Sequence, residues 1–148
     1  MTNWDYRFLA MAQLVATWSK DPSSKVGSVI ADGKRIVSLG FNGFPAGTDD
    51  DPSIYGDRER KYRRVLHAEQ NAMSFAKRDL TGCTIYITHP PCARCAAQIV
   101  QEGIRRVVYP SPGADFLVRW EDDVKEARAM FKEANVLFLE VEPAGMQP

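Results

Sequence analysis

The sequence is poor in cysteine and histidine, has no long apolar run and carries no excess of charge of either sign. Its 148 residues include three cysteines and two histidines, and Lys plus Arg balance Asp plus Glu at 19 each. A neutral chain lacks the basic excess that general nucleic-acid and membrane-surface binders need, so we expect neither kind of partner. No apolar run approaches the roughly 18 residues of a membrane-spanning helix.

The few cysteines and the polar start of the chain also bear on its compartment. Residues 1–7 lack the charged-then-apolar plan of a signal peptide. An odd number of cysteines, two of them close together, fits a reduced intracellular protein with a metal site better than a disulfide scaffold. We therefore expect a cytoplasmic protein, in the host cytoplasm if the source is a virus.

The length and composition fit one globular domain. Hydrophobic residues make up 45% and charged residues 26% of the chain, which are ordinary values for such a protein. A chain of this length can bury a sizeable core and leaves no room for a second domain. We expect a single domain over residues 1–148, with a disordered tail at 143–148.

Hydrophobic periodicity divides the chain into helices and strands that largely alternate. The predicted helices cover residues 3–19, 66–77, 92–102 and 120–134, and the predicted strands cover 26–31, 35–41, 84–88, 106–109 and 136–139. Asp32-Gly33 predicts a hairpin between the first two strands. This order predicts an α/β protein, a three-layer α/β/α sandwich with a mixed sheet of about five strands. The later strands should be parallel and joined by right-handed crossovers.

The segment 42–64 shows no clear periodicity. A loop of this length inside a domain is usually functional or mobile. We interpret it as a long loop, either functional or a solvated lid, and the sequence leaves both readings open.

Two short motifs contain residues that bind zinc. His67-Ala68-Glu69 and Pro91-Cys92-Ala93-Arg94-Cys95 each fall at the start of a predicted helix. One histidine and two cysteines supply three zinc ligands and leave the fourth position open, which is typical of a catalytic site. The spacing of Cys92 and Cys95 puts both sulfurs on one side of the first helical turn, where the helix N-terminus favours thiolates.

Glu69 follows His67 by only two residues, so the two side chains should not both point at the metal. We therefore assign Glu69 to proton transfer beside the open fourth position of the zinc ion. Zinc lowers the pKa of water to about 7 and so supplies hydroxide, which would attack C4 of a cytosine ring. Glu69 would take the proton of the water, deliver it to N3 and protonate the departing amine. An H-x-E motif followed by P-C-x-x-C is characteristic of zinc-dependent nucleobase deaminases.

Three other interpretations of the motifs remain open. A closed zinc knuckle would need a fourth ligand, for which His89 and Cys83 are the remaining candidates. A redox C-x-x-C pair and a non-catalytic zinc or nucleotide-binding sensor module are the others. The zinc knuckle and the sensor module leave Glu69 without a role, and the redox pair ignores His67 and lacks thioredoxin-like surroundings. We expect Cys83 to be a small buried apolar residue.

Beyond the zinc motifs, the sequence resembles the deoxycytidylate (dCMP) deaminases from about Trp4 to Phe138. The matching segments are residues 19–27, 40–47, 67–72 and 103–104. The resemblance implies a cytidine-deaminase-like sandwich that converts dCMP to dUMP and ammonia and so feeds thymidylate synthesis. It also implies a homo-oligomer, with a hexamer favoured, and regulation by dCTP and dTTP.

The resemblance also assigns roles to single residues. The matches to the zinc ligands and the proton carrier are His67, Cys92, Cys95 and Glu69. Asn42 matches an asparagine that hydrogen-bonds the sugar, and Ala68 would offer its backbone N–H to the base. Some members hold a second zinc through histidine and cysteine residues that residues 48–66 lack, so we expect one zinc per chain.

The 5′-phosphate of such a substrate needs cationic or N–H donors. The cationic candidates are Lys20, Lys25, Arg58, Arg60, Lys61, Arg63 and Arg64. Lys25 lies between a serine turn and a strand, so we assign it to substrate binding. Residues 110–119 are unlike the family, which leaves open another cytosine nucleotide or nucleoside, or adenosine in tRNA, as the substrate.

Overall fold

The computed structural model describes residues 2–142, which contain one mixed five-stranded sheet with the order β2-β1-β3-β4-β5. The strands are β1 (Gly27–Asp32), β2 (Arg35–Phe41), β3 (Thr84–Ile87), β4 (Arg106–Pro110) and β5 (Leu137–Val141). β1 runs antiparallel to β2 and β3, whereas β3, β4 and β5 are parallel to one another. The predicted mixed sheet with parallel later strands is therefore confirmed.

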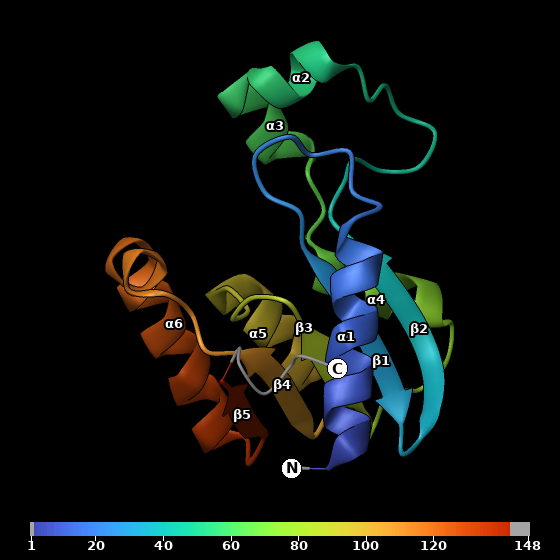
Figure 1. Ribbon diagram of the computed structural model, residues 1–148, viewed down its shortest axis with the longest axis vertical. Coiled ribbons are helices and arrows are strands. Elements are labelled where there is room, and N and C mark those ends of the chain that lie inside the picture. The colour runs from blue at the N-terminus through green and yellow to red at the C-terminus, as the bar shows by residue number, and fades with distance from the viewer. Residues whose placement is uncertain (1, 143–148) are drawn as a thin grey trace.

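Helices cover both faces of the sheet (Figure 1). They are α1 (Asn3–Ala16), α2 (Pro52–Gly56), α3 (Arg58–Arg64), α4 (Ala68–Ala76), α5 (Ala93–Gln101) and α6 (Ala114–Glu133). On one face Phe8 and Leu9 of α1 pack against the sheet. On the other face α4, α5 and α6 bury Ala72, Ile99 and Phe131 respectively. These two cores make the predicted three-layer α/β/α sandwich.

Residues 42–64 are not a structureless loop, and that expectation was wrong. α2 and α3 lie within this segment and stand beyond the end of the sheet, at the top of Figure 1. Asp51 caps α2 by accepting a hydrogen bond from Ser53 N (2.9 Å), and Asp57 caps α3 by accepting one from Arg60 N (3.3 Å). Aspartate is a preferred N-cap residue, so these caps start helices of five and seven residues, too short to show periodicity.

α6 begins at Ala114 rather than at residue 120. Its first turns leave large apolar side chains in solvent, and Val118 is 82% exposed. Trp120 interrupts the helix with φ −124° and ψ 18°. Because only the part after this kink has a buried face, periodicity detected that part alone.

The predicted hairpin is confirmed, with its loop one residue further along. Asp32 pairs with Arg35, so the loop is Gly33-Lys34. Gly33 has a φ of 60°, which glycine adopts without strain.

Two further expectations concern the whole chain. A single domain over residues 1–148 stays a prediction, and the tail at 143–148 lies outside the described residues. Within residues 2–142, no helix has both the length and the apolarity that crossing a membrane requires.

Gly40 allows α4 to lie directly on β2. A Cβ atom at Gly40 would lie 2.3 Å from the Ala68 carbonyl oxygen and 2.4 Å from Ala72 N. Both are backbone atoms of α4, so Gly40→Ala must push this helix away from the sheet. We expect Gly40→Ala to lower the free energy of unfolding by about 1–3 kcal/mol, measured by urea denaturation.

Gly56→Ala is the matched control for this substitution. A Cβ atom at Gly56 would meet no atom within 4 Å. Equal stability of the Gly40→Ala and Gly56→Ala variants would contradict the close approach of α4 to β2.

Candidate active site

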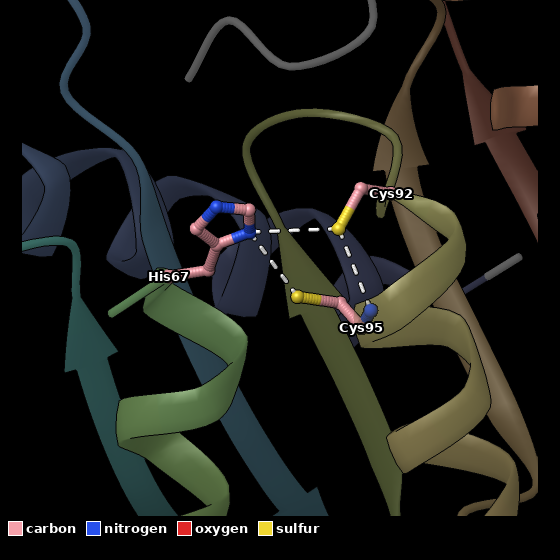
Figure 2. A group of neighbouring side chains, drawn as sticks. All are labelled: His67, Cys92 and Cys95. Atoms are coloured by element: carbon pink, nitrogen blue, oxygen red, sulfur yellow. Dashed lines mark hydrogen bonds between the residues drawn. The ribbon is translucent and has the colours of Figure 1, made fainter. Parts of the chain in front are cut away.

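Three of the predicted site residues meet at the N-terminal ends of α4 and α5 (Figure 2). His67 is the N-cap of α4, Cys92 is the N-cap of α5, and Cys95 lies in the first turn of α5. His67 Nδ1 is 3.5 Å from Cys92 Sγ and 3.3 Å from Cys95 Sγ. The ligand atoms of the three residues all lie within 4.8 Å of one another.

Local hydrogen bonds hold these residues at the helix starts. Cys92 Sγ accepts a hydrogen bond from Cys95 N at 3.4 Å, so the sulfur itself caps α5. The backbone N–H of His67 donates to Gln70 Oε1 at 2.9 Å, as in the second half of a capping box. Both caps fix the backbone at the helix starts. The side chains of His67, Cys92 and Cys95 face one another between the two helices (Figure 2).

The close contacts in the cluster shift the ionisation of all three side chains. The hydrogen bond from the Cys95 thiol, helped by His67 and opposed by burial, lowers the pKa of Cys92 to about 4. The neighbouring Cys92 sulfur and burial raise the pKa of Cys95, and the contact with Cys92 raises that of His67. One imidazole and two sulfurs fit zinc, which prefers nitrogen and sulfur ligands.

Neither other candidate ligand joins this cluster within residues 2–142. Cys83 is fully buried in the hydrophobic core, as predicted, and His89 stacks on Phe116 with 5.8 Å between ring centroids. The cluster therefore offers three protein ligands, which is the number that catalytic zinc sites use.

Glu69 is buried beside the cluster, in the first turn of α4. Its side chain is only 4% exposed. Burial raises the pKa of Glu69 above its usual range, against the opposing charge of His67. A carboxyl group with a raised pKa is suited to exchanging protons near neutral pH. Its role in proton transfer stays a prediction.

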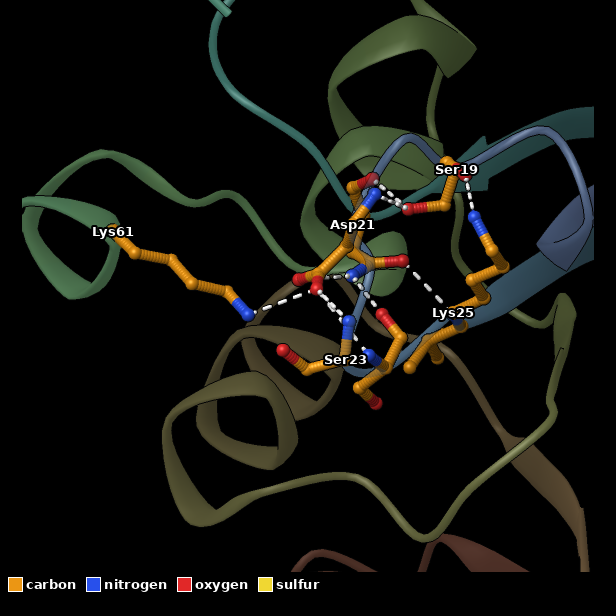
Figure 3. Close-up of polar contacts among 8 residues, drawn as sticks. Ser19, Asp21, Ser23, Lys25 and Lys61 are labelled. Atoms are coloured by element: carbon orange, nitrogen blue, oxygen red, sulfur yellow. Dashed lines mark hydrogen bonds and ion pairs between the residues drawn. The ribbon is translucent and has the colours of Figure 1, made fainter. Parts of the chain in front are cut away.

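Asn42 is 6% exposed and directly follows β2. It belongs to a polar network around Asp21, whose contact with Lys61 is drawn in Figure 3. Its Oδ1 accepts a hydrogen bond from Val26 N at 2.8 Å. Its Nδ2 donates to the Ser24 carbonyl oxygen (2.8 Å) and to Asp21 Oδ2 (3.3 Å). Both N–H groups of the amide and one lone pair of Oδ1 are thus used inside the protein. The role of Asn42 in substrate binding stays a prediction.

Lys25 and Ala68 are the other residues predicted to contact the substrate. Lys25 Nζ donates to the carbonyl oxygen of Ser19, and no contact joins it to the zinc ligands among the described residues. Ala68 is fully buried as the first residue of α4, where a backbone N–H has no partner one helical turn earlier. The roles of Lys25 and Ala68 stay predictions.

Sequence reasoning missed two acidic residues next to these groups. Asp21 is 2% exposed and receives hydrogen bonds from Ser23 N (2.9 Å) and from Lys61 Nζ of α3 (2.9 Å). The Asp-Pro-Ser-Ser sequence is typical of such a turn and could have identified Asp21. Asp123 of α6 accepts a hydrogen bond from Ala93 N at 2.7 Å, and no local pattern announces this contact.

The structure thus combines an α/β/α sandwich with a cluster of one histidine and two cysteines that could hold a metal ion. Residues 2–111 match the cytidine and deoxycytidylate deaminase zinc-binding region, and the chain belongs to that family.

Individual proteins agree with this assignment. The chain is 51% identical over 136 residues to an uncharacterized deaminase in the luxG 3′ region of Aliivibrio fischeri, with 92% of each chain covered. It is 38% identical over 149 residues to the deoxycytidylate deaminase of Mus musculus, covering 95% of this chain and 80% of the mouse protein. The apo crystal structure of the dCMP deaminase of cyanophage S-TIM5 is similar with a TM-score of 0.68 and 25% identity, covering 95% of this chain and all of that one.

Proposed function

We propose that this protein hydrolyses dCMP to dUMP and ammonia with one catalytic zinc per chain. The observation that carries the proposal is the convergence of His67, Cys92 and Cys95 beside the buried carboxyl group of Glu69. Family membership and the deoxycytidylate deaminase of the mouse support the substrate. A sensor module without activity would have no use for Glu69.

The chain's own residues divide the chemistry between holding the metal and moving protons. His67, Cys92 and Cys95 would hold the zinc ion, which supplies hydroxide at neutral pH because zinc lowers the pKa of water to about 7. Glu69 takes one proton from the attacking water and delivers it to N3 of the pyrimidine. Glu69 then takes the proton of the new hydroxyl group on C4 and passes it to the amine, so that the C4–N4 bond breaks, the C4 carbonyl forms and ammonia departs.

Asn42 and Ala68 would orient the substrate in this site. Because both N–H groups of Asn42 are already used, a sugar hydroxyl can only donate to its Oδ1. The N–H of Ala68 lies next to Glu69 in the first turn of α4 and would meet an acceptor atom of the base. Lys25 remains our candidate for the phosphate, whereas Lys61 is committed to Asp21.

The resemblance to dCMP deaminases also leads us to propose a homo-oligomer, most simply a hexamer, that responds to dCTP and dTTP. A cytoplasmic location belongs to the same proposal. Size measurement in solution, with and without each nucleotide, tests the assembly.

The substrate assignment predicts a clear order of reactivity. We expect zinc-loaded protein to release ammonia from dCMP with a kcat/KM about 10–100-fold above that for deoxycytidine. Deoxycytidine has no phosphate and therefore lacks a charged hydrogen bond that dCMP makes. CMP tests the sugar in the same assay. No turnover of dCMP, even with dCTP added, combined with turnover of adenosine in a tRNA stem-loop, would overturn the proposal.

A further inference from the structure

A hydrogen bond between residues far apart in the sequence links the first residue of α5 to α6. Asp123 Oδ2 accepts a hydrogen bond from Ala93 N at 2.7 Å. Ala93 is the first residue of α5 and stands between the two cysteines of the predicted metal site. Asp123 comes from the body of α6, 30 residues further along the chain.

This contact adds a cap to the first turn of α5. The first amides of a helix have no carbonyl partner within the helix. Cys92 Sγ serves Cys95 N at 3.4 Å, and the Cys92 carbonyl oxygen serves Ala96 N at 2.8 Å. Both of these acceptor atoms belong to Cys92, a predicted metal ligand. Asp123 supplies a cap from another helix, through a residue outside the cluster.

The packing of α6 holds Asp123 in this place. Its neighbour Val124 and the following Ala127 and Phe131 are buried on the face of α6 that packs toward the sheet. Asp123 also follows the kink at Trp120, so it belongs to the well-packed part of the helix.

We infer that Asp123 is a positioning residue for the metal: its hydrogen bond to Ala93 N fixes the first turn of α5 so that the sulfurs of Cys92 and Cys95 face His67. The inference rests on the proposed zinc site. Asp123 is not a member of the cluster of His67, Cys92 and Cys95, so the inferred role runs through its hydrogen bond to the backbone of α5. Hydrogen-bonded groups behind metal ligands typically change metal affinity by about 10–100-fold.

Three variants and two measurements on the folded full chain test this role. Asp123→Ala removes the acceptor, Asp123→Asn keeps an acceptor oxygen without the charge, and Asp122→Ala changes the exposed neighbour on the same helix. The zinc dissociation constant is measured by competition with a chelator. The absorption spectrum of the Co²⁺-loaded protein reports the geometry at the sulfurs.

We expect Asp123→Ala to weaken zinc binding by about 10–100-fold and to alter the sulfur-to-cobalt absorption bands. Asp123→Asn should recover most of the affinity, and Asp122→Ala should match the unchanged protein. A zinc affinity of Asp123→Ala within about twofold of that of Asp122→Ala would overturn the inference, as would an Asn variant no better than the Ala variant. Failure of the unchanged protein to bind zinc would instead refute the proposed function.

A purely structural cap gives a different result. It would lower the free energy of unfolding of the metal-free protein and leave the zinc affinity of the folded fraction unchanged. Urea denaturation of the three metal-free variants separates this outcome from the positioning role.

Discussion

Replacing Glu69 with glutamine is expected to leave zinc bound and to lower kcat for dCMP by about two to four orders of magnitude. The amide has almost the shape of the carboxyl group, so the packing of this buried side chain is kept. An amide cannot take a proton from water and return it to N3 and to the leaving amine, so the transfer steps lose their carrier. Metal content and single-turnover release of ammonia, measured on the same preparation, separate binding from chemistry.

Glu126→Gln supplies the control for this experiment, because Glu126 is exposed on α6. We expect this variant to keep both zinc and turnover. Glu69→Ala would lose activity as well, but it leaves a cavity in a buried position, so glutamine is the sharper test. If Glu69→Gln kept a tenth or more of the original kcat, the assignment of Glu69 to proton transfer would be refuted.

The sheet and the helices that cover it were predictable because their residues are buried in regular patterns. Each of the five strands falls where alternating or continuous apolar residues were found, and the turn glycine Gly33 marked the hairpin. α2 and α3 escaped detection because two helical turns or fewer cannot establish a period of 3.6 residues. The first turns of α6 were missed because Leu117 and Val118 are exposed, so that no regular buried face marks this part of the helix.

Within the candidate site, residues that belong to short local motifs could be predicted, whereas contacts between residues far apart in the sequence could not. The zinc ligands could be found because Cys92 and Cys95 are local neighbours and His67 starts another predicted helix. The ion pair of Lys61 with Asp21 joins residues 40 positions apart, and the Asp123 contact spans 30. Such pairs exist only after the sandwich has formed, so no local pattern encodes them.

The same limit affects the interpretation of charges. Lys61 was one of seven cationic candidates for the substrate phosphate, and the structure commits it to a carboxylate that is 2% exposed. This partly buried ion pair anchors α3 to the turn that also holds Asn42. Removing Lys61 would leave the buried carboxylate of Asp21 without its charged partner. The arm formed by α2 and α3 is thus connected to the predicted sugar contact through Asp21.

Replacing Cys92 with serine should remove the metal and preserve the fold. Serine is a good N-cap residue, so its hydroxyl can still accept the hydrogen bond from Cys95 N that starts α5. A neutral hydroxyl is a poor substitute for a thiolate on zinc. We therefore expect zinc affinity to fall by more than about 100-fold, beyond the effect typical of groups behind the ligands. Chelator competition measures the loss, and thermal unfolding of the metal-free protein tests whether the fold persists.

The third cysteine provides the matched control, because Cys83 is a buried thiol outside the cluster. Cys83→Ala should keep zinc and turnover while lowering the free energy of unfolding by about 1 kcal/mol, as small losses of core volume do. Loss of zinc in Cys83→Ala would identify a fourth protein ligand and a closed, structural site. Loss in Cys92→Ser together with retention in Cys83→Ala is the result that an open catalytic centre requires, since three protein ligands then hold the ion and the fourth position is free for the attacking water.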